Sequence, residues 1–290
     1  MKTSSNLVRD CRKYYASQLE KTYESDEANA LIMILLKHYF NIDRMKIALE
    51  PDLRLSESEL LTLHFAVKEL LKNKPVQYII GETEFCGMRF FVNENVLIPR
   101  PETEEMVQLL AVGNRPSTVK ILDVGTGSGC IAISLAKLIP NSDVAAVDVS
   151  EKALEVARKN AEANGVNVHF VLDDILNPHV KTHGRASQQF DIIVSNPPYV
   201  CESEKSEMRA NVLEHEPFSA LFVPDSDPLV FYRKILEFAQ KTLKPDGTIW
   251  FEINERFGKE TAELCHRMGF ENVEIIKDFR GRERILKVFK

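Results

Sequence analysis

The sequence predicts an α/β protein in which a parallel sheet, covered by helices on both faces, follows a small helical bundle and a β-hairpin. Three observations predict this fold class. Residues 1–75 show only helical periodicity, residues 76–100 are interrupted by turn residues, and strand and helix patterns alternate over residues 101–290. We therefore expect a helical domain over 1–75, a β-hairpin linker over 76–100 and an α/β domain over 101–290.

The composition is that of a soluble globular protein. Of the 290 residues, 44% are hydrophobic and 28% are charged. No stretch approaches the roughly 18 consecutive apolar residues of a membrane span, and the opening residues, MKTSSNLVRDCRK, lack the apolar core of a signal peptide. We expect a cytoplasmic protein whose five cysteines, which include no C-x-x-C pair, are reduced thiols.

Charge and histidine spacing each bear on a class of ligand. The formal net charge of −6 disfavours a protein that gains most of its affinity by neutralising phosphates, although a local basic patch is compatible with it. His179 and His183 have the spacing of a metal site on one helix face. They lie in NPHVKTHGR, which contains proline and glycine and no apolar period, so we expect a solvated loop and no metal.

The first domain contains three long helical patterns, which are LVRDCRKYYASQLEKTY, SDEANALIMILLKHYF and SESELLTLHFAVKELLKNKP. The third opens with a capping box formed by Ser56 and Glu59. No catalytic pattern is visible here, so we expect a domain for recognition or support. The segment that follows, EFCGMRFFVNENVLIPRPETE, alternates short apolar runs with turn residues and predicts the hairpin.

Seven strands are predicted in the second half, at 119–124, 143–149, 168–172, 191–195, 248–253, 273–278 and 284–289. Near-continuous apolar strands separated by helices indicate a parallel sheet, and the short turn FRGRE makes the last two an antiparallel edge hairpin. One helix is expected at 151–164, between Ser150 as N-cap and Gly165. Another is expected at 228–242, with Asp227 as cap and Pro228 in the first position.

A glycine-rich loop follows the first of these strands in ILDVGTGSGCIAISLA. Residues Gly125, Thr126, Gly127, Ser128 and Gly129 lead from the strand into a helix, where free N–H groups and bare backbone accept a ligand closely. Asp148 ends the next strand, where its carboxylate can accept from both hydroxyls of a ribose. Together these features indicate a nucleoside cofactor.

The identity of that nucleoside depends on Asp123. GSGCIA also fits the dinucleotide fingerprint, but an acidic residue two positions before Gly125 would repel phosphate and would favour the ammonium or sulfonium of S-adenosylmethionine. We therefore favour a methyl-donor site over a dinucleotide site. In VLDDIL, Asp173 and Asp174 either reach the adenine amino group or cap the next turn.

The stretch DIIVSNPPYV ends a strand in Asn196, Pro197, Pro198 and Tyr199, at the sheet edge where the glycine loop also lies. An amide or exocyclic nitrogen is a poor nucleophile, so its N–H groups must be aimed and held by acceptors. The Asn196 side-chain oxygen and the Pro197 carbonyl can be those acceptors, and Tyr199 can stack on the planar group. The alternative is a proline-rich turn with no ligand.

These motifs resemble the bacterial HemK/PrmC-type protein-(glutamine-N5) methyltransferases, which modify class-one peptide chain release factors. The resemblance covers nearly the whole chain, through PVQYIIGETEF, VLIPRPETE, ILDVGTGSGCIAISLA, AVDVS, DIIVSNPPYV, HEPFSAL and KDFRGRERIL. It implies a Rossmann-like, seven-stranded S-adenosylmethionine-dependent methyltransferase domain behind a helical partner-recognition domain. It also implies a role in translation termination, and no metal.

The resemblance also implies roles for individual residues. Cofactor contacts are expected from the glycine loop, Asp148, Asp174, Ile175 and Asn196, and the Asn-Pro-Pro-Tyr stretch is expected to hold the glutamine of a Gly-Gly-Gln motif. Two positions depart from the family pattern, because Phe218 replaces a usual arginine and Asn254 replaces a common glycine. Both are expected to lie outside the substrate clamp and to affect partner contacts.

Three other functions remain open at this point. Adenine presents the same planar NH₂, so a nucleic-acid adenine N6-methyltransferase is the first alternative, although it needs base flipping and a basic surface. A non-catalytic cofactor-binding assembly factor would need an altered clamp, and the clamp here is complete. A nicotinamide oxidoreductase would need an acid/base pair that the sequence does not offer.

Overall fold

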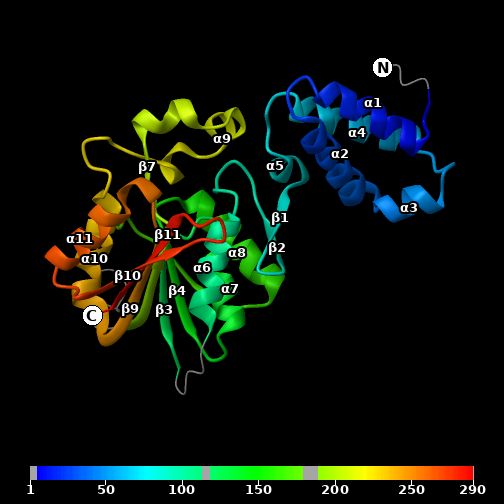
Figure 1. Cartoon of the computed structure of the whole chain (residues 1–290). Helices are drawn as coiled ribbons and strands as arrows, with labels where there is room; N and C mark the ends of the chain where they lie inside the picture. The colour runs from blue at the N-terminus through cyan, green and yellow to red at the C-terminus, as the bar shows by residue number, and fades with distance from the viewer. Residues whose placement is uncertain (1–4, 113–117, 179–188, 290) are drawn as a thin grey trace. The chain divides into compact units, whose positions relative to one another are not determined.

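The computed structural model of the chain describes residues 5–112, 118–178 and 189–289. The chain divides into two compact units, one formed by residues 1–81 with 209–215 and the other by residues 82–208 with 216–290. Figure 1 labels their helices and strands. Within the described ranges, no helix has both the length and the apolar character needed to cross a membrane.

The first unit is entirely helical. Its elements are α1 (Val8–Leu19), α2 (Ser25–Phe40), α3 (Arg44–Leu49), α4 (Glu57–Leu70), α5 (Val76–Ile80) and α9 (Ala210–His215). The predicted capping box is present at the start of α4, where the Ser56 hydroxyl and the Glu59 carboxylate each bond the other residue's backbone N–H. Helix α2 ends where Asn41 adopts a left-handed conformation. Apolar faces of α1, α2 and α4 form its core.

A β-hairpin opens the second unit. Strands β1 (Glu82–Phe85) and β2 (Met88–Phe91) pair antiparallel around a Cys86-Gly87 turn in which both residues have positive φ. Residues 76–80, which the sequence places in the hairpin linker, instead form α5. Strand β2 is joined to α8 (Glu151–Asn164) by two hydrogen bonds. The Asn160 side chain donates to the Phe91 carbonyl and accepts from the Phe91 N–H.

All seven predicted strands are present and form one sheet. They are β3 (Lys120–Val124), β4 (Asp143–Asp148), β5 (His169–Leu172), β6 (Phe190–Ser195), β9 (Leu243–Glu252), β10 (Asn272–Lys277) and β11 (Glu283–Phe289). Their order is β10-β11-β9-β6-β3-β4-β5, with β10 and β11 as the expected antiparallel edge hairpin. Strands β7 (Val200–Cys201) and β8 (Phe222–Val223) pair separately.

Helices cover both faces of this sheet (Figure 1). The remaining elements of the unit are α6 (Pro101–Ala111), α7 (Cys130–Leu138), η1 (Glu202–Glu207), η2 (Phe218–Ala220), α10 (Val230–Thr242), η3 (Glu255–Phe257) and α11 (Gly258–Arg267). Side chains alternate along β3, so that Ile121 packs into the core with α6, α7 and α8 while Leu122 packs into the core with α10 and α11.

Two predicted boundaries are wrong. Helix α10 begins at Val230 and not at Pro228, and Asp227, the expected cap, forms an ion pair with Arg233 through two hydrogen bonds. Strand β9 begins at Leu243 and not at residue 248, because buried Leu243 already pairs with Phe190 of β6. The predicted helix 151–164, with Ser150 and Gly165 as its caps, is confirmed.

Candidate active site

A cavity of about 350 Å³ lies in the second unit where β3, β4 and β6 end. Because β3 lies between β4 and β6, the loops that follow these parallel strands open to the same space. The predicted site residues that line it are Gly125, Thr126, Gly127, Ser128, Asp148, Asp173, Asp174, Ile175, Asn196, Pro197 and Pro198. Gly129 and Tyr199 are not among the lining residues.

The glycine loop forms one wall of this cavity. Gly125 and Gly127 have φ of +73° and +55°, and a Cβ added to either would meet nothing within 4 Å. Their backbone is therefore open to a ligand. Gly129 serves a different purpose, because its Cβ would lie 2.8 Å from Cδ1 of Ile133 and 3.1 Å from Cβ of Ala157. It lets the loop pack tightly on α7 and α8.

Asp123 lies beneath the glycine loop and is not among the residues that line the cavity, so any effect of its charge on a cofactor acts through the loop. It is fully buried, and its Oδ2 accepts from the Thr126 hydroxyl at 2.6 Å and from the Ala132 N–H at 3.2 Å. Its Oδ1 has no hydrogen-bond partner within the described residues. Burial raises the pKa of this carboxyl to about 7.

Asp148 lies at the cavity edge of β4. Its Oδ2 accepts from the Gly127 N–H at 2.8 Å and its Oδ1 from the Ser150 N–H at 2.9 Å. A carboxylate oxygen can accept two hydrogen bonds, so each oxygen retains capacity for a ligand hydroxyl. This arrangement fits the ribose of a nucleoside, while burial raises the pKa of the Asp148 carboxyl.

The turn after β5 brings Asp173, Asp174 and Ile175 to the cavity. Asp174 caps this turn, because its Oδ1 accepts from the Leu176 N–H at 2.9 Å, and Asp173 Oδ1 accepts from the Asp174 N–H at 2.9 Å. The capping alternative is thus present. It does not exclude the adenine contact, since both residues also line the cavity.

Asn196, Pro197 and Pro198 form the wall after β6. The end of β6 is fastened to β3 by the Ser195 hydroxyl, which donates to the Val124 carbonyl at 2.7 Å. The Pro197 ring fixes its own φ, and the ring of Pro198 restricts the ψ of Pro197, so the Pro197 carbonyl has little freedom. The Asn196 Nδ2 donates to the Thr103 hydroxyl oxygen at 3.0 Å.

Tyr199 is not among the residues that line the cavity. Its ring packs against the core beneath α10 and α11, and its hydroxyl donates to Glu252 Oε1 at 2.9 Å. The expected stacking of this ring on a planar substrate group stays a prediction. Burial and the neighbouring carboxylate of Glu252 raise the pKa of the Tyr199 hydroxyl well above its ordinary value.

Thr103 and Glu252 were missed by the sequence reasoning. Both are buried, and the Thr103 hydroxyl donates to Glu252 Oε2. Thr103 also lines the cavity. Thr103 belongs to the IPRPETE motif, and Glu252 is a charged residue at the end of the apolar run TIWFEI. A carboxylate at the end of an apolar strand is unusual, and this could have indicated a functional role for Glu252. Nothing in the sequence, however, pairs Glu252 with Thr103.

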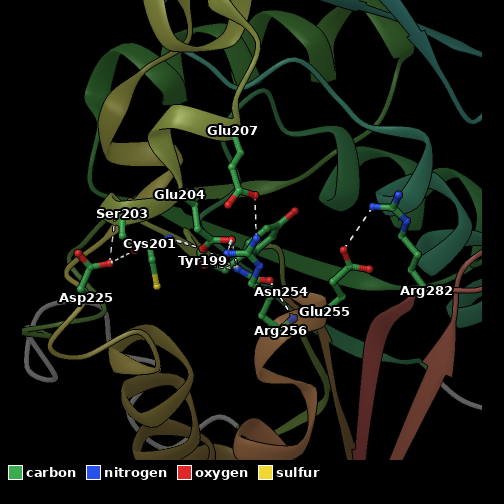
Figure 2. A network of polar contacts seen from close by, with 10 residues as sticks. All are labelled: Tyr199, Cys201, Ser203, Glu204, Glu207, Asp225, Asn254, Glu255, Arg256 and Arg282. Carbon is green, nitrogen blue, oxygen red and sulfur yellow. Dashed lines mark hydrogen bonds and ion pairs between the residues drawn. The ribbon is translucent and has the colours of Figure 1, made fainter.

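Asn254 is not a residue of the clamp, but it contacts the clamp's backbone. Its Nδ2 donates to the Tyr199 carbonyl at 3.1 Å and to Glu204 Oε2 at 3.0 Å. Glu204 in turn accepts from the Cys201 N–H at 2.8 Å and lies 3.4 Å from Nη1 of Arg256. Figure 2 shows Asn254 in this network, close to Tyr199, Glu204 and Arg256.

Two further motif residues, Glu216 and Phe218, are chain neighbours of the lining residue Pro217. Glu216 of HEPFSAL is buried and accepts from Nη2 of Arg100 at 2.6 Å and from the Ile98 N–H at 3.2 Å, which joins it to the VLIPRP segment. Phe218 is 53% exposed, and its ring lies 4.4 Å from that of Phe222. Its position is compatible with the expected contact to a partner.

Within the described ranges, no group of three or more His, Cys, Asp or Glu side chains could hold a metal ion. His179 and His183 lie outside those ranges. All five cysteines are free thiols.

Comparison with known proteins places both parts of the chain. Residues 116–277 match the family described as a methyltransferase domain, and residues 10–81 match the PrmC N-terminal domain. A protein of Flavobacterium psychrophilum named release factor glutamine methyltransferase is 46% identical over 97% of this chain and 99% of its own length. One of the same name from Bacteroides thetaiotaomicron is 45% identical over 94% of this chain and 96% of its own length.

The fold has solved relatives as well. The crystal structure of a methyltransferase from Pyrococcus furiosus, 24% identical, superposes with a TM-score of 0.52 and covers 77% of this chain and 96% of that one. At this identity the likeness concerns the fold of the sheet and its helices.

Proposed function

This chain belongs to the release factor glutamine methyltransferase family, and from that membership we propose how its cavity works. The protein is an S-adenosylmethionine-dependent methyltransferase that modifies a glutamine of peptide chain release factors. We infer that the target is the side-chain amide nitrogen in the Gly-Gly-Gln motif of class-one factors, through which it modulates translation termination.

The glycine loop and Asp148 hold the cofactor in this proposal. When bound, S-adenosylmethionine supplies a methyl group on a positively charged sulfur, which a nitrogen can attack. The open backbone at Gly125 and Gly127 accommodates it, the free acceptor capacity of Asp148 suits ribose hydroxyls, and Asp174 and Ile175 flank the base. Asn196 completes the wall on the substrate side.

Asn196 and Pro197 orient the substrate amide. Its nitrogen lone pair is delocalised into the carbonyl, so the N–H groups need acceptors that draw charge off as the new bond forms. Asn196 and Pro197 both line the cavity, and the Asn196 Oδ1 and the rigid Pro197 carbonyl are the two acceptors that we propose for these N–H groups. Tyr199 contributes through its bond to Glu252, from outside the cavity.

One observation carries the proposal. The glycine loop, Asp148 and the Asn-Pro-Pro stretch line a single cavity, although they come from three separate strand ends. A methyl donor on one wall would therefore face an amide held on the other. A site built to bond a substrate NH₂ would also reject a carboxylate, which offers two further acceptors and no donor.

The helical unit is proposed to recognise the release factor. It exposes Leu61 and Phe65 on α4, with exposed fractions of 46% and 55%, and these are candidates for an apolar partner contact. A protein that acts on release factors would work in the cytoplasm, where translation takes place.

Transfer of labelled methyl from S-adenosylmethionine tests the function. Three acceptors are compared: a class-one release factor, the same factor with its Gly-Gly-Gln glutamine replaced, and adenine-containing DNA. We expect label on the intact factor only. Label that persists without the glutamine would contradict the proposed target, and label on DNA would favour the adenine alternative.

A further inference from the structure

A side-chain amide can bind a substrate in two ways, because one of its ends accepts hydrogen bonds and the other donates them. The proposed clamp works only if Asn196 presents Oδ1 to the substrate N–H. If the amide were rotated by a half turn, Nδ2 would meet another donor and no hydrogen bond would form. The site therefore needs something that distinguishes the two ends of Asn196.

Thr103 makes that distinction. A threonine hydroxyl has one proton, and that of Thr103 is donated to Glu252 Oε2. Toward Asn196 the Thr103 oxygen can then only accept, and Nδ2 of Asn196 donates to it at 3.0 Å. Thr103 is 2% exposed, so water cannot readily supply a different partner.

Glu252 fixes the direction of this chain of hydrogen bonds. An ionised carboxylate has no proton to donate, and its two oxygens accept from the Thr103 and Tyr199 hydroxyls. Glu252 is 1% exposed, and the Tyr232 hydroxyl donates to its backbone carbonyl at 3.0 Å. Burial raises the pKa of Glu252, and the two hydroxyl donors and the charge of Arg284 act against that rise.

Resting on the proposed function, we propose that Thr103 and Glu252 are positioning residues that set the orientation of the Asn196 amide, so that its Oδ1 faces the cavity. Glu252 receives a hydrogen bond directly from Tyr199 and, through Thr103, controls Asn196. The two polar ends of the Asn-Pro-Pro-Tyr stretch thus depend on one buried carboxylate.

Three variants test this with the full-length protein and a release factor. Thr103→Val keeps the side-chain shape but removes the hydroxyl, and Thr103→Ser keeps the hydroxyl. Thr261→Val is the control: it removes a buried hydroxyl of α11 that donates to the Phe257 carbonyl at 2.7 Å. We expect Thr103→Val to lower kcat by about 10-fold to 100-fold. The affinity for S-adenosylmethionine should remain, and Thr103→Ser should recover most of the turnover.

A double-mutant cycle separates orientation from general destabilisation. Without the Asn196 amide there is nothing to orient, so Thr103→Val should have little further effect in an Asn196→Ala background. Losses that add fully would overturn the proposal, as would wild-type kcat in a folded Thr103→Val protein or equal losses from Thr103→Val and Thr261→Val.

Glu252→Gln provides a second route to the same result. Glutamine offers one oxygen and one NH₂ in place of two oxygens, so either the Thr103 or the Tyr199 hydroxyl loses its acceptor. When the NH₂ faces Thr103, the Thr103 proton can turn toward Asn196. We expect kcat to fall while cofactor affinity is kept, and unchanged kcat in the folded variant would contradict the proposal. Failure of the wild-type protein to methylate any release factor would instead count against the proposed function.

Discussion

The Asn254 side chain holds the backbone carbonyl of Tyr199, with 3.1 Å between Nδ2 and the carbonyl oxygen. Its Oδ1 meanwhile accepts from the Arg256 N–H at 3.0 Å and caps η3. Asn254 therefore has two separable roles, because one atom braces the stretch that carries the clamp and the other stabilises a short helix.

Substitutions at residue 254 should separate these roles. Serine retains an oxygen that can cap η3 but cannot reach the Tyr199 carbonyl as the amide does, and alanine can do neither. We expect Asn254→Ala to lower the free energy of unfolding by about 1 kcal/mol and Asn254→Ser by clearly less. Denaturant unfolding measures that difference.

Turnover should depend on Nδ2 of Asn254, the atom that donates to the Tyr199 carbonyl. Both the Ser and the Ala variant lose the bond to the Tyr199 carbonyl, so methyl transfer to a release factor should fall to a similar extent in the two proteins. If turnover instead followed stability, with Asn254→Ser close to wild type, the brace on Tyr199 would have no part in activity.

Asn196→Ala should separate binding from chemistry. Its loss removes a proposed acceptor for the substrate N–H and leaves the glycine loop and Asp148 in place, so kcat should fall on the order of 10² to 10³ while affinity for S-adenosylmethionine changes little. Calorimetric titration of the cofactor and labelled-methyl transfer measure the two quantities. Asn164→Ala is a matched control, since that amide donates to the Arg89 carbonyl at 3.0 Å and does not line the cavity.

The glycines differ in what an added methyl group would meet. Gly127→Ala places a Cβ in the open space of the cavity, so we expect weaker cofactor binding together with about 1–2 kcal/mol of backbone strain. Gly165→Ala, at a helix end with φ of +64° and open surroundings, should show similar strain with unchanged cofactor affinity. Gly129→Ala should cost more stability than either, because its Cβ would meet Cδ1 of Ile133 at 2.8 Å and the Cβ and Cα of Ala157 at 3.1 Å and 3.3 Å.

Thermal unfolding and cofactor titration of the three glycine variants check this. Equal cofactor affinity in Gly127→Ala and Gly165→Ala would show that the glycine loop does not face the cofactor.

The sheet could be predicted from the sequence because each strand is a local apolar run, such as Ile192-Ile193-Val194, bounded by turn residues. The glycine loop and Asp148 could be predicted because their spacing reflects one βαβ unit. The burial of Asp123 beneath the loop could not be predicted, since it depends on how α7 packs over β3 and not on its neighbours in sequence.

The contacts that arise only in three dimensions could not be predicted. Thr103 and Glu252 are 149 residues apart, and no local pattern pairs a threonine of one motif with a strand-end glutamate. The predicted start of α10 was also wrong, and the ion pair between Asp227 and Arg233 is a contact that the local pattern does not show. Propensity describes what a residue favours alone, whereas these side chains satisfy a particular neighbour.

Asp123 should make the stability of the protein depend on pH. Its pKa is about 7 in the folded protein against an ordinary 3.8, so the folded state holds a proton that the unfolded state has released between those values. The stabilisation is fully present below about pH 4 and is lost as the pH rises to about 7, by up to about 1.4 kcal/mol per pH unit.

Asp123→Asn isolates this contribution. The asparagine oxygen can replace Oδ2 as acceptor for Thr126 and Ala132, and its NH₂ takes the place of the unpartnered Oδ1, so the fold should be retained. Denaturant unfolding of both proteins between pH 4 and pH 8 cancels the other titrating groups. The variant should gain stability relative to wild type as the pH rises to about 7 and hold that gain above it. A difference that stays constant across the range would mean that Asp123 remains ionised in the folded protein, with its charge compensated by the loop above it.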